Sequence, residues 1–322
     1  MSICVTASVP ARLHLGFLDL NGDTGRRFGS VGLPLSEPQT LITLSCADQT
    51  TVEGPDHERA ARHLDTLSRH LGIRTGHRLI VEQAIPPHIG LGSGTQMAVA
   101  VAAALRKLHG LPIDAGSDAR ILGRGARSGI GIAAFENGGL IVDAGRSHAD
   151  REPPVVARIP FPEEWRVLLI LDRAYTGLHG EEEIKAFRAL PPFPATSAGE
   201  ICRRVLMQAL PAILERDFTA FGDAIESIQL VMGSYFAPAQ GGVFTSSRVE
   251  RVARRMVEAG AAGIGQSSWG PTGFAFAPSE EAVLDIVRAA QAAVDPGIEV
   301  KIVKARNTGA EVTTKTLAPV GN

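Results

Sequence analysis

The feature that most constrains the fold is a glycine-rich loop, residues 85–96, between an apolar run at 79–81 and an alanine-rich run that continues to residue 108. The apolar run is typical of a buried strand, and the alanine-rich run consists of helix formers. A loop in this position turns several backbone N–H groups toward one point, beside the positive end of the helix dipole. The sequence therefore predicts an anion-binding site at the start of this helix.

The spacing of the loop residues narrows the kind of anion. Gly90, Gly92 and Gly94 follow one another as Gly-x-Gly-x-Gly, which is not a dinucleotide fingerprint. No Lys-Ser or Lys-Thr follows the glycines, which excludes a Walker A loop. Ser93 and Thr95 are expected to donate to phosphate oxygens or to cap the helix. On the glycines alone, a structural turn with a Ser or Thr cap is an equally good interpretation.

Composition excludes several classes of protein. The 322 residues suggest two domains, and 44% hydrophobic with 20% charged residues indicates an ordinary globular protein. A formal charge of −2 gives no basic excess for nucleic-acid binding. The longest wholly apolar run, 97–105, is too short to cross a bilayer, so we expect a cytoplasmic protein that does not bind membranes. The three cysteines are far apart and are expected to be buried free thiols.

Periodicity predicts alternating strands and helices. Strands are expected at 5–18, 41–44 and 79–81, and a helix at 57–71. A proline-rich stretch at 153–162 predicts a domain boundary near residue 160. The second half then shows strand patterns at 167–171, 274–276 and 300–303, and helical patterns at 198–214, 218–232 and 247–259. Two charged groups, 181–183 and the arginines at 251, 254 and 255, are interpreted as solvated helix faces.

The loop also resembles a known motif. Pro86-Pro87 followed by Gly90-Leu91-Gly92-Ser93-Gly94 is similar to the phosphate-binding Pro-x-x-x-Gly-Leu-Gly-Ser-Ser motif of the GHMP kinase superfamily. It departs at Gly94, where those kinases usually have a second serine that helps to hold Mg-nucleotide. The resemblance implies an α+β fold of two domains with ligand bound between them. Residues 1–160, with the phosphate loop at 86–96, would resemble the second domain of ribosomal protein S5, and residues 161–322 would be ferredoxin-like.

Within that superfamily, residues 11–22 and 25–32 resemble the N-terminal signature of the β-ribofuranosylaminobenzene 5′-phosphate synthases. Further matching blocks span nearly the whole chain, at 127–131, 135–139, 176–181, 235–242, 265–272 and 305–310. The resemblance implies a pentosyltransferase of tetrahydromethanopterin biosynthesis, a one-carbon pathway. It would join 5-phosphoribosyl 1-pyrophosphate to 4-aminobenzoate and release CO2 and pyrophosphate. It also implies Mg²⁺ with the pyrophosphate, no PLP or NAD, and a homodimer. The sequence does not distinguish 4-aminobenzoate from 4-hydroxybenzoate as the acceptor.

The resemblance suggests roles for charged residues near the N-terminus. Arg26 is expected to make bidentate phosphate contacts, assisted by Arg12 or Arg27. Asp19 is expected either to hold Mg²⁺ or to face positive charge on the sugar. A turn with Asn21-Gly22 is an alternative role for Asp19.

Later residues are candidate substrate contacts. Trp269 either stacks on the aromatic acceptor or closes the domain interface. Gln266, Ser267 and Ser268 are expected to make polar contacts with substrate. His14 is a candidate donor, as are His88 and His179, although a lone histidine is more often structural. Lys304 and Arg306 either bind the substrate carboxylate or flank a terminal strand.

Two other functions remain open from the sequence. The first is an ATP-dependent small-molecule kinase, which the loop favours and Gly94 disfavours. The second is a non-catalytic protein that binds anions.

Overall fold

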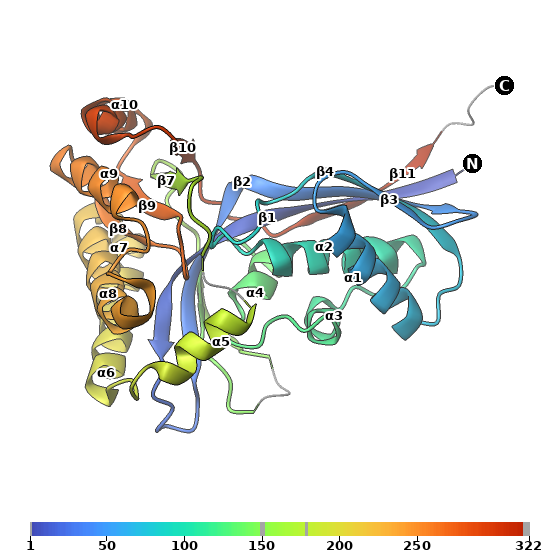
Figure 1. The fold of residues 1–322 in the computed structure, drawn as a ribbon, viewed down its shortest axis with the longest axis horizontal. Coiled ribbons are helices and arrows are strands. Elements are labelled where there is room, and N and C mark those ends of the chain that lie inside the picture. Colours follow the sequence, from blue (N-terminus) through green and yellow to red (C-terminus); the bar gives the residue numbers. More distant parts are fainter. Residues whose placement is uncertain (1, 149–151, 178–179, 318–322) are drawn as a thin grey trace.

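Two long antiparallel strands, β1 (Ser2–Asp19) and β2 (Phe28–Ala47), run through the molecule. They belong to a seven-stranded sheet in the order β11-β1-β2-β4-β3, and β5 pairs with both β2 and β6. The other strands are β3 (Thr51–Glu53), β4 (Gly76–Gln83), β5 (Leu140–Asp143), β6 (Val155–Ile159) and β11 (Glu311–Leu317). This computed structural model describes residues 2–148, 152–177 and 180–317 (Figure 1).

Four helices lie on one side of this sheet (Figure 1). They are α1 (His57–His70), α2 (Ser93–Leu108), α3 (Ala115–Ile121) and α4 (Ile130–Glu136). The alanines and valines of α2 are buried almost without interruption between β1, β2 and α1. Small side chains allow this close approach, and it fixes the amino end of α2 relative to β1.

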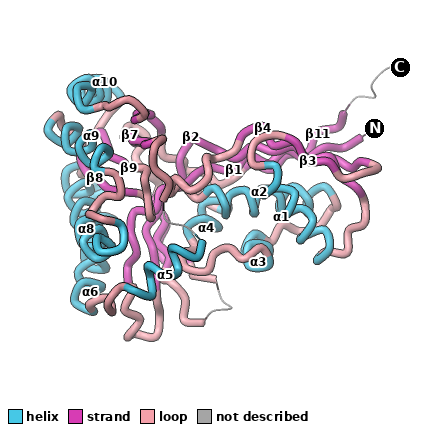
Figure 2. The backbone as a smooth tube through the Cα atoms, viewed as in Figure 1, coloured by secondary structure: helices cyan, strands magenta, loops and turns pink. Residues whose placement is uncertain are grey.

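The second sheet has the order β10-β7-β9-β8 and is antiparallel. Its strands are β7 (Arg166–Asp172), β8 (Ala262–Gln266), β9 (Gly273–Ala277) and β10 (Ile298–Val303). Numbered along the chain, the order is 4-1-3-2, which is the ferredoxin-like arrangement expected for this half. The helices are α5 (Gly180–Ala189), α6 (Ala195–Arg204), α7 (Leu210–Glu215), α8 (Phe218–Gln240), α9 (Ser247–Glu258) and α10 (Glu280–Ala290) (Figure 2).

The two halves share one hydrophobic core. Leu13 and Leu15 of β1 are completely buried in the same cluster as Phe221 and Ile225 of α8 and Phe274 of β9. Burial of apolar surface is the main favourable contribution to folding, so this shared cluster holds the two domains together. A site between the two domains would therefore be supported by a continuous hydrophobic core.

The structure contains elements that the periodicity did not predict, and it divides one predicted helix. The segment 198–214 is not one helix, because a π-helical stretch at Val205–Ala209 separates α6 from α7. Pro211 has no N–H to donate to the preceding turn, which interrupts a regular α-helix. In addition, β11 pairs with β1, so the chain returns to the first sheet after completing the second.

Surface features agree only in part with the sequence interpretation. Cys4 is buried, but Cys46 and Cys202 are exposed, so the expectation of three buried thiols was wrong. Cys46 lies near the end of β2, and Cys202 lies on α6. The arginines 251, 254 and 255 are exposed on α9 and pair with Asp295, Glu250 and Glu258, which confirms a solvated face. No helix within the described residues is long and apolar enough to cross a membrane.

Candidate functional site

The glycine-rich loop joins β4 to the amino end of α2, as the sequence predicts. Gly90 and Gly92 have φ angles of 87° and 85°, a region that favours glycine. Gly92 is the N-cap of α2, and no side chain caps the helix. Of the two roles expected for Ser93 and Thr95, capping is therefore not observed, and donation to phosphate stays a prediction. The methyl group of Thr95 instead lies against Gly131 of α4. The first N–H groups of α2 are thus left to a ligand or to water.

The carbonyl of Gly90 is held from two sides. Arg12 Nη1 of β1 donates to it at 2.6 Å, and Ser267 Oγ of the β8–β9 loop donates to it at 2.8 Å. Ser267 Oγ also accepts a hydrogen bond from His14 N at 3.0 Å. A Cβ on Gly90 would lie 2.2 Å from the Ser267 carbonyl oxygen, so only glycine fits here. This arrangement, the Gly90 seam, joins both domains to the glycine-rich loop.

Arg12 is a buried cation under the loop. Burial lowers the pKa of Arg12 to about 10, and the Glu183 carboxylate opposes this shift. Its side chain lies against Gly92, where an added Cβ would be 3.3 Å from the guanidinium carbon. Its Nε is buried without a hydrogen-bond partner among the described residues. An anion on the loop would lie beside this charge.

Strand β1 is irregular at these residues. The pairing of β1 with β2 shifts register between Pro10 and Arg12 and again between His14 and Gly16. Such bulges redirect side chains next to functional sites. They place Arg12 under the loop and His14 in the adjoining pocket.

A narrow pocket lies beside the seam, between β1, α8 and the β8–β9 loop. Aromatic rings form much of its wall, and Trp269 is within 4.5 Å of Phe236 and 5.4 Å of Phe187, ring centre to ring centre. Trp269 therefore both packs at the domain interface and lines the pocket. The lining residues are His14, Gly16, Phe17, Gln229, Met232, Gly233, Phe236, Gln240, Val243, Gln266, Ser268 and Trp269.

The glutamines of the pocket are hydrogen-bonded within the protein. Gln266 Oε1 accepts from Thr245 N at 2.6 Å, and Gln266 Nε2 donates to Gln240 Oε1 and to the Ser268 carbonyl. Gln229 Oε1 accepts from Gln266 N at 2.8 Å. These amides therefore shape the pocket and leave its surface largely apolar.

His14 differs from the other polar residues of the pocket. Its Nε2 is fully buried and has no hydrogen-bond partner in the part of the chain that the structure describes. Among the described residues that line the pocket, no other buried side-chain polar atom lacks one. Burial, with a smaller contribution from Arg12, lowers the pKa of His14 to about 3. The imidazole is therefore neutral at physiological pH and can donate or accept one hydrogen bond.

Asp19 and Arg26 lie in the β1–β2 hairpin. Asp19 Oδ1 accepts hydrogen bonds from Asn21 N at 2.6 Å and Gly22 N at 3.1 Å, which is the turn role left open by the sequence. Arg26 Nε and Nη2 donate to the carbonyls of Ala144 and Gly145 at 2.9 and 2.8 Å. Their roles toward a substrate remain predictions.

Other candidates have structural partners. Arg27 Nε donates to the Leu20 carbonyl, and Arg306 Nη2 pairs with Glu311. The backbone N–H of Lys304 donates to Ser36 Oγ. The His88 carbonyl accepts from Gly177 N at 2.9 Å. His179 lies outside the described residues.

Two sets of charges near the loop were missed or misread in the sequence. Glu183 of α5 is not simply solvated, because it pairs with Arg127 and faces Arg12. Arg59 Nη1 lies 3.5 Å from Ser93 Oγ, and the Arg124 guanidinium lies against Gly94. Neither arginine belongs to a motif, and both are about 30 residues from the loop along the chain, so local pattern gave no signal.

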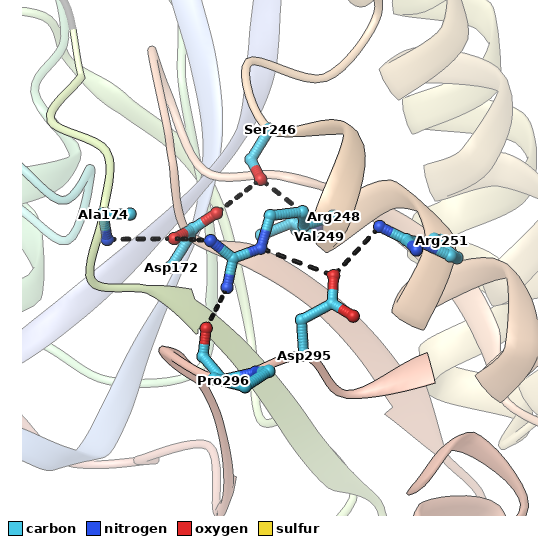
Figure 3. Close-up of polar contacts among 8 residues, drawn as sticks. All are labelled: Asp172, Ala174, Ser246, Arg248, Val249, Arg251, Asp295 and Pro296. Carbon is cyan, nitrogen blue, oxygen red and sulfur yellow. Dashed lines mark hydrogen bonds and ion pairs between the residues drawn. The ribbon is translucent and has the colours of Figure 1, made fainter. Parts of the chain in front are cut away.

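A buried carboxylate holds the segment 173–177, which follows β7 and contacts the glycine-rich loop through Gly177. Asp172, at the end of β7, accepts hydrogen bonds from Ser246 Oγ at 2.7 Å and Ala174 N at 3.0 Å (Figure 3). Arg248 Nη1 lies 3.7 Å from the same carboxylate. This network fixes the start of the segment whose Gly177 N–H contacts the loop.

The side chains do not fit a metal ion held by the protein alone. No group of three or more His, Cys, Asp or Glu residues suited to a metal occurs within 2–148, 152–177 and 180–317. Asp19 offers one carboxylate, and one of its oxygens already serves the turn. Mg²⁺ therefore stays a prediction, and the substrate's phosphates would hold it.

Comparison with known proteins identifies the two halves separately. The GHMP kinases N terminal domain matches residues 58–139, and the GHMP kinases C terminal domain matches residues 209–295. The β-ribofuranosylphenol 5′-phosphate synthase of Methanothermobacter thermautotrophicus is 34% identical over 96% of this chain and 99% of its own length. The protein of the same name from Archaeoglobus fulgidus is 34% identical over 94% and 97%.

Solved structures share the fold. Homoserine kinase from Cytophaga hutchinsonii superposes with a TM-score of 0.70 at 20% identity, covering 97% of both chains. Mevalonate diphosphate decarboxylase from Staphylococcus aureus superposes with a TM-score of 0.69 at 17% identity, covering 97% of this chain and 98% of its own. At these identities the likeness concerns the fold alone.

Replacing Gly90 by alanine should weaken the anion binding that we predict for the glycine-rich loop. The added Cβ would meet the Ser267 carbonyl at 2.2 Å, so the loop must move. Gly110→Ala is the control, because Gly110 also has a positive φ (68°) but no atom within 4 Å of the added methyl. Both variants should lose about 1–2 kcal/mol of stability from the positive φ. Isothermal titration with inorganic pyrophosphate should show at least about tenfold weaker binding for Gly90→Ala alone. Equal affinities for the two variants would contradict this role of the loop.

The depressed pKa of His14 should make folding stability fall at low pH. Below pH 6.5 the unfolded chain gains a proton on His14 that the folded protein does not accept until about pH 3. At pH 5 this costs about 2 kcal/mol relative to neutral pH. Urea unfolding of His14→Asn should show a correspondingly flatter dependence between pH 7.5 and 5 than the unmodified protein. Replacing the exposed His70 should leave the dependence unchanged, and an equal slope in His14→Asn would show that His14 is not the group responsible.

Proposed function

The chain belongs to the family of the β-ribofuranosylphenol 5′-phosphate synthases, built on the GHMP kinase fold, and we propose that it joins 5-phosphoribosyl 1-pyrophosphate to a para-substituted benzoate. The bond formed links the anomeric carbon to the ring carbon that carries the carboxylate. CO2 and pyrophosphate leave. The observation that carries the proposal is an anion-binding loop beside an apolar, aromatic-lined pocket, joined by the Gly90 seam.

The loop and the adjacent arginines suit a phosphorylated donor. The uncapped N–H groups of α2 and its dipole favour phosphate oxygens. Arg12 lies under the loop, and guanidinium groups suit phosphate geometry. Position 94 carries no hydroxyl, in contrast to the second serine of the related kinases' motif. The helix end and Arg12 suit any phosphorylated ligand, and the missing hydroxyl at position 94 favours a sugar diphosphate over Mg-ATP.

In this proposal the aromatic acceptor binds at the apolar pocket, whose free volume of about 30 Å³ has to widen to admit a ring. The rings of the pocket can pack against an arene and exclude water that would hydrolyse an activated sugar. The neutral His14 Nε2 offers one hydrogen bond to the acceptor's polar substituent. The relatives are named for the phenol product, which corresponds to 4-hydroxybenzoate, whereas 4-aminobenzoate gives the aminobenzene product. Both acceptors have a para group that can accept or donate this bond.

The reaction balances without an electron-sink cofactor. The C1–O bond of the α-configured donor breaks, and its electron pair leaves with pyrophosphate. The ring carbon attacks C1 from the opposite face, which gives the β-configured product. The para substituent stabilises the cationic ring, and the electron pair of the C–carboxylate bond restores aromaticity as CO2 departs. The protein's task is to orient both substrates and to stabilise separated charge.

Three further properties belong to the proposal. Mg²⁺ accompanies the pyrophosphate and is bound mainly by its oxygens, a homodimer is the working assembly, and the cytoplasm is the site of action. They rest on family resemblance and on the need to neutralise the leaving group.

A product assay tests the proposal. The purified protein is incubated with 5-phosphoribosyl 1-pyrophosphate and carboxyl-labelled 4-aminobenzoate or 4-hydroxybenzoate, with and without Mg²⁺. Labelled CO2 and pyrophosphate should appear in equal amounts, and the rates with the two acids identify the acceptor. In a parallel arm, ATP and a panel of alcohols should give no ADP. Binding without CO2 release would favour the non-catalytic alternative, and ADP formation would favour a kinase.

Asp19→Asn should preserve the fold and lower turnover. Asparagine keeps an oxygen that can accept the Asn21 and Gly22 hydrogen bonds, but it removes the negative charge that would face the sugar cation. We expect kcat to fall about 100-fold, the scale of losing one electrostatic contact to a transition state. Thermal melting should be unchanged. Asp23→Asn, exposed in the same hairpin, is the control, and normal turnover in Asp19→Asn would remove Asp19 from the mechanism.

A further inference from the structure

Arginines from two distant segments lie near the first turn of α2. Arg59 and Arg62 lie on α1, and Arg124 lies in the loop between α3 and α4. His63 is buried close to them, and its pKa is lowered to about 4 by burial and then by Arg124, Arg59 and Arg62. A neutral imidazole here adds no further positive charge. The positive potential of the region therefore comes from the guanidinium groups.

Two of these arginines contact the phosphate loop. Arg59 Nη1 lies 3.5 Å from Ser93 Oγ. A Cβ on Gly94 would lie 2.9 Å from Arg124 Nη1 and 3.2 Å from its guanidinium carbon. The Arg124 guanidinium thus occupies the space that a side chain at position 94 would need. Glycine at this position places a cation beside the uncapped N–H groups of α2.

Arg124 has charge without a matching acceptor. Its Nε is fully buried without a hydrogen-bond partner among the described residues, and the Asp56 carboxylate only partly offsets the positive charge of its neighbours. Burial is the main cause that lowers its pKa, followed by Arg59 and Arg62. Arg59, by contrast, has Asp56 at 3.4 Å. Burying donors without acceptors is costly, and a bound anion would supply the acceptors.

We propose that Arg59 and Arg124, with the amino end of α2, form the subsite for the diphosphate group of the sugar donor. This assignment rests on the proposed function and specifies which end of the donor binds here. None of the described residues that line the aromatic pocket belongs to the glycine-rich loop, and the Gly90 seam lies between the two regions. In a displacement at C1, the leaving group lies on the face opposite the arene.

The diphosphate is also the group that needs these charges most. It gains negative charge as the C1–O bond breaks, whereas the 5′-phosphate does not change. Cations fixed beside the leaving group therefore stabilise the transition state more than the bound substrate. Arg12, under the same loop, adds its guanidinium to those of Arg59 and Arg124.

Titration with inorganic pyrophosphate alone tests the subsite without requiring turnover. Arg124→Gln and Arg59→Gln should each weaken pyrophosphate binding about tenfold or more, the scale of a lost charge-assisted hydrogen bond. Arg62→Gln is the matched control. Arg62 lies on the same helix as Arg59, but its side chain is 68% exposed and only 4.0 Å from Glu58. The affinity of the Arg62→Gln variant for pyrophosphate should stay within about twofold of that of the unmodified protein.

The Gly94→Ala variant should displace Arg124 without destabilising the fold. Gly94 lies in α2 with ordinary helical geometry, so alanine suits the backbone. The added methyl must push aside only the end of a flexible arginine. The thermal midpoint should not fall, while pyrophosphate binding should weaken about as much as in Arg124→Gln.

Ribose 5-phosphate is the second probe, because it has the 5′-phosphate and lacks the diphosphate. Its binding should be unchanged in all four variants. The assignment is overturned if pyrophosphate does not bind, if Arg124→Gln and Arg59→Gln bind it normally, or if they lose ribose 5-phosphate instead. If the expected losses appear while the unmodified protein makes no CO2 from either benzoate, the subsite stands and the proposed reaction fails.

Discussion

The hydrogen bonds to the Gly90 carbonyl hold the functional region together. Arg12 Nη1 from the first domain and Ser267 Oγ from the second both donate to this one oxygen. The loop therefore takes its shape from both domains, and the shared core around Leu13 and Phe221 keeps them in register. Because Ser267 also accepts the His14 N–H, the anion loop and the aromatic pocket are parts of one hydrogen-bonded unit.

This arrangement explains how a kinase fold can serve a different transfer reaction. The scaffold offers a helix amino end for phosphate oxygens, which any phosphorylated substrate can use. What differs in this chain is the surroundings of that helix end. Gly94 leaves its side-chain space to Arg124, and the neighbouring pocket is lined by Trp269, Phe236 and Phe17. In our proposal, Arg124 binds the departing diphosphate and the aromatic pocket residues contact the incoming arene.

The sequence predicted the parts of the molecule that depend on local pattern. The loop, α2 and the long strand β1 occur where glycine spacing, alanine content and β-branched residues predicted them. Helices α1, α8 and α9 also agree with the expected periodicity. The family resemblance supplied the arrangement of two domains, which local pattern alone left as α/β or α+β.

Contacts between distant segments could not be predicted in this way. Arg59 and Arg124 reach the loop only because α1 and the α3–α4 loop fold against α2, and no spacing rule relates them to Gly94. The acidic run at 181–183 predicted a solvated helix face, whereas the structure pairs Glu183 with Arg127. The pairing of β11 with β1 likewise needs tertiary structure, because β11 is short and mostly exposed.

In our proposal, the glycine-rich loop binds a phosphoribosyl diphosphate in place of a nucleoside triphosphate. Thermal melting of the protein with each ligand tests it most directly, since a ligand that binds the folded state raises the melting temperature. With Mg²⁺ present, 5-phosphoribosyl 1-pyrophosphate should raise the midpoint, and a non-hydrolysable ATP analogue should neither raise it nor compete. Stabilisation by the ATP analogue with no response to the sugar diphosphate would contradict the account.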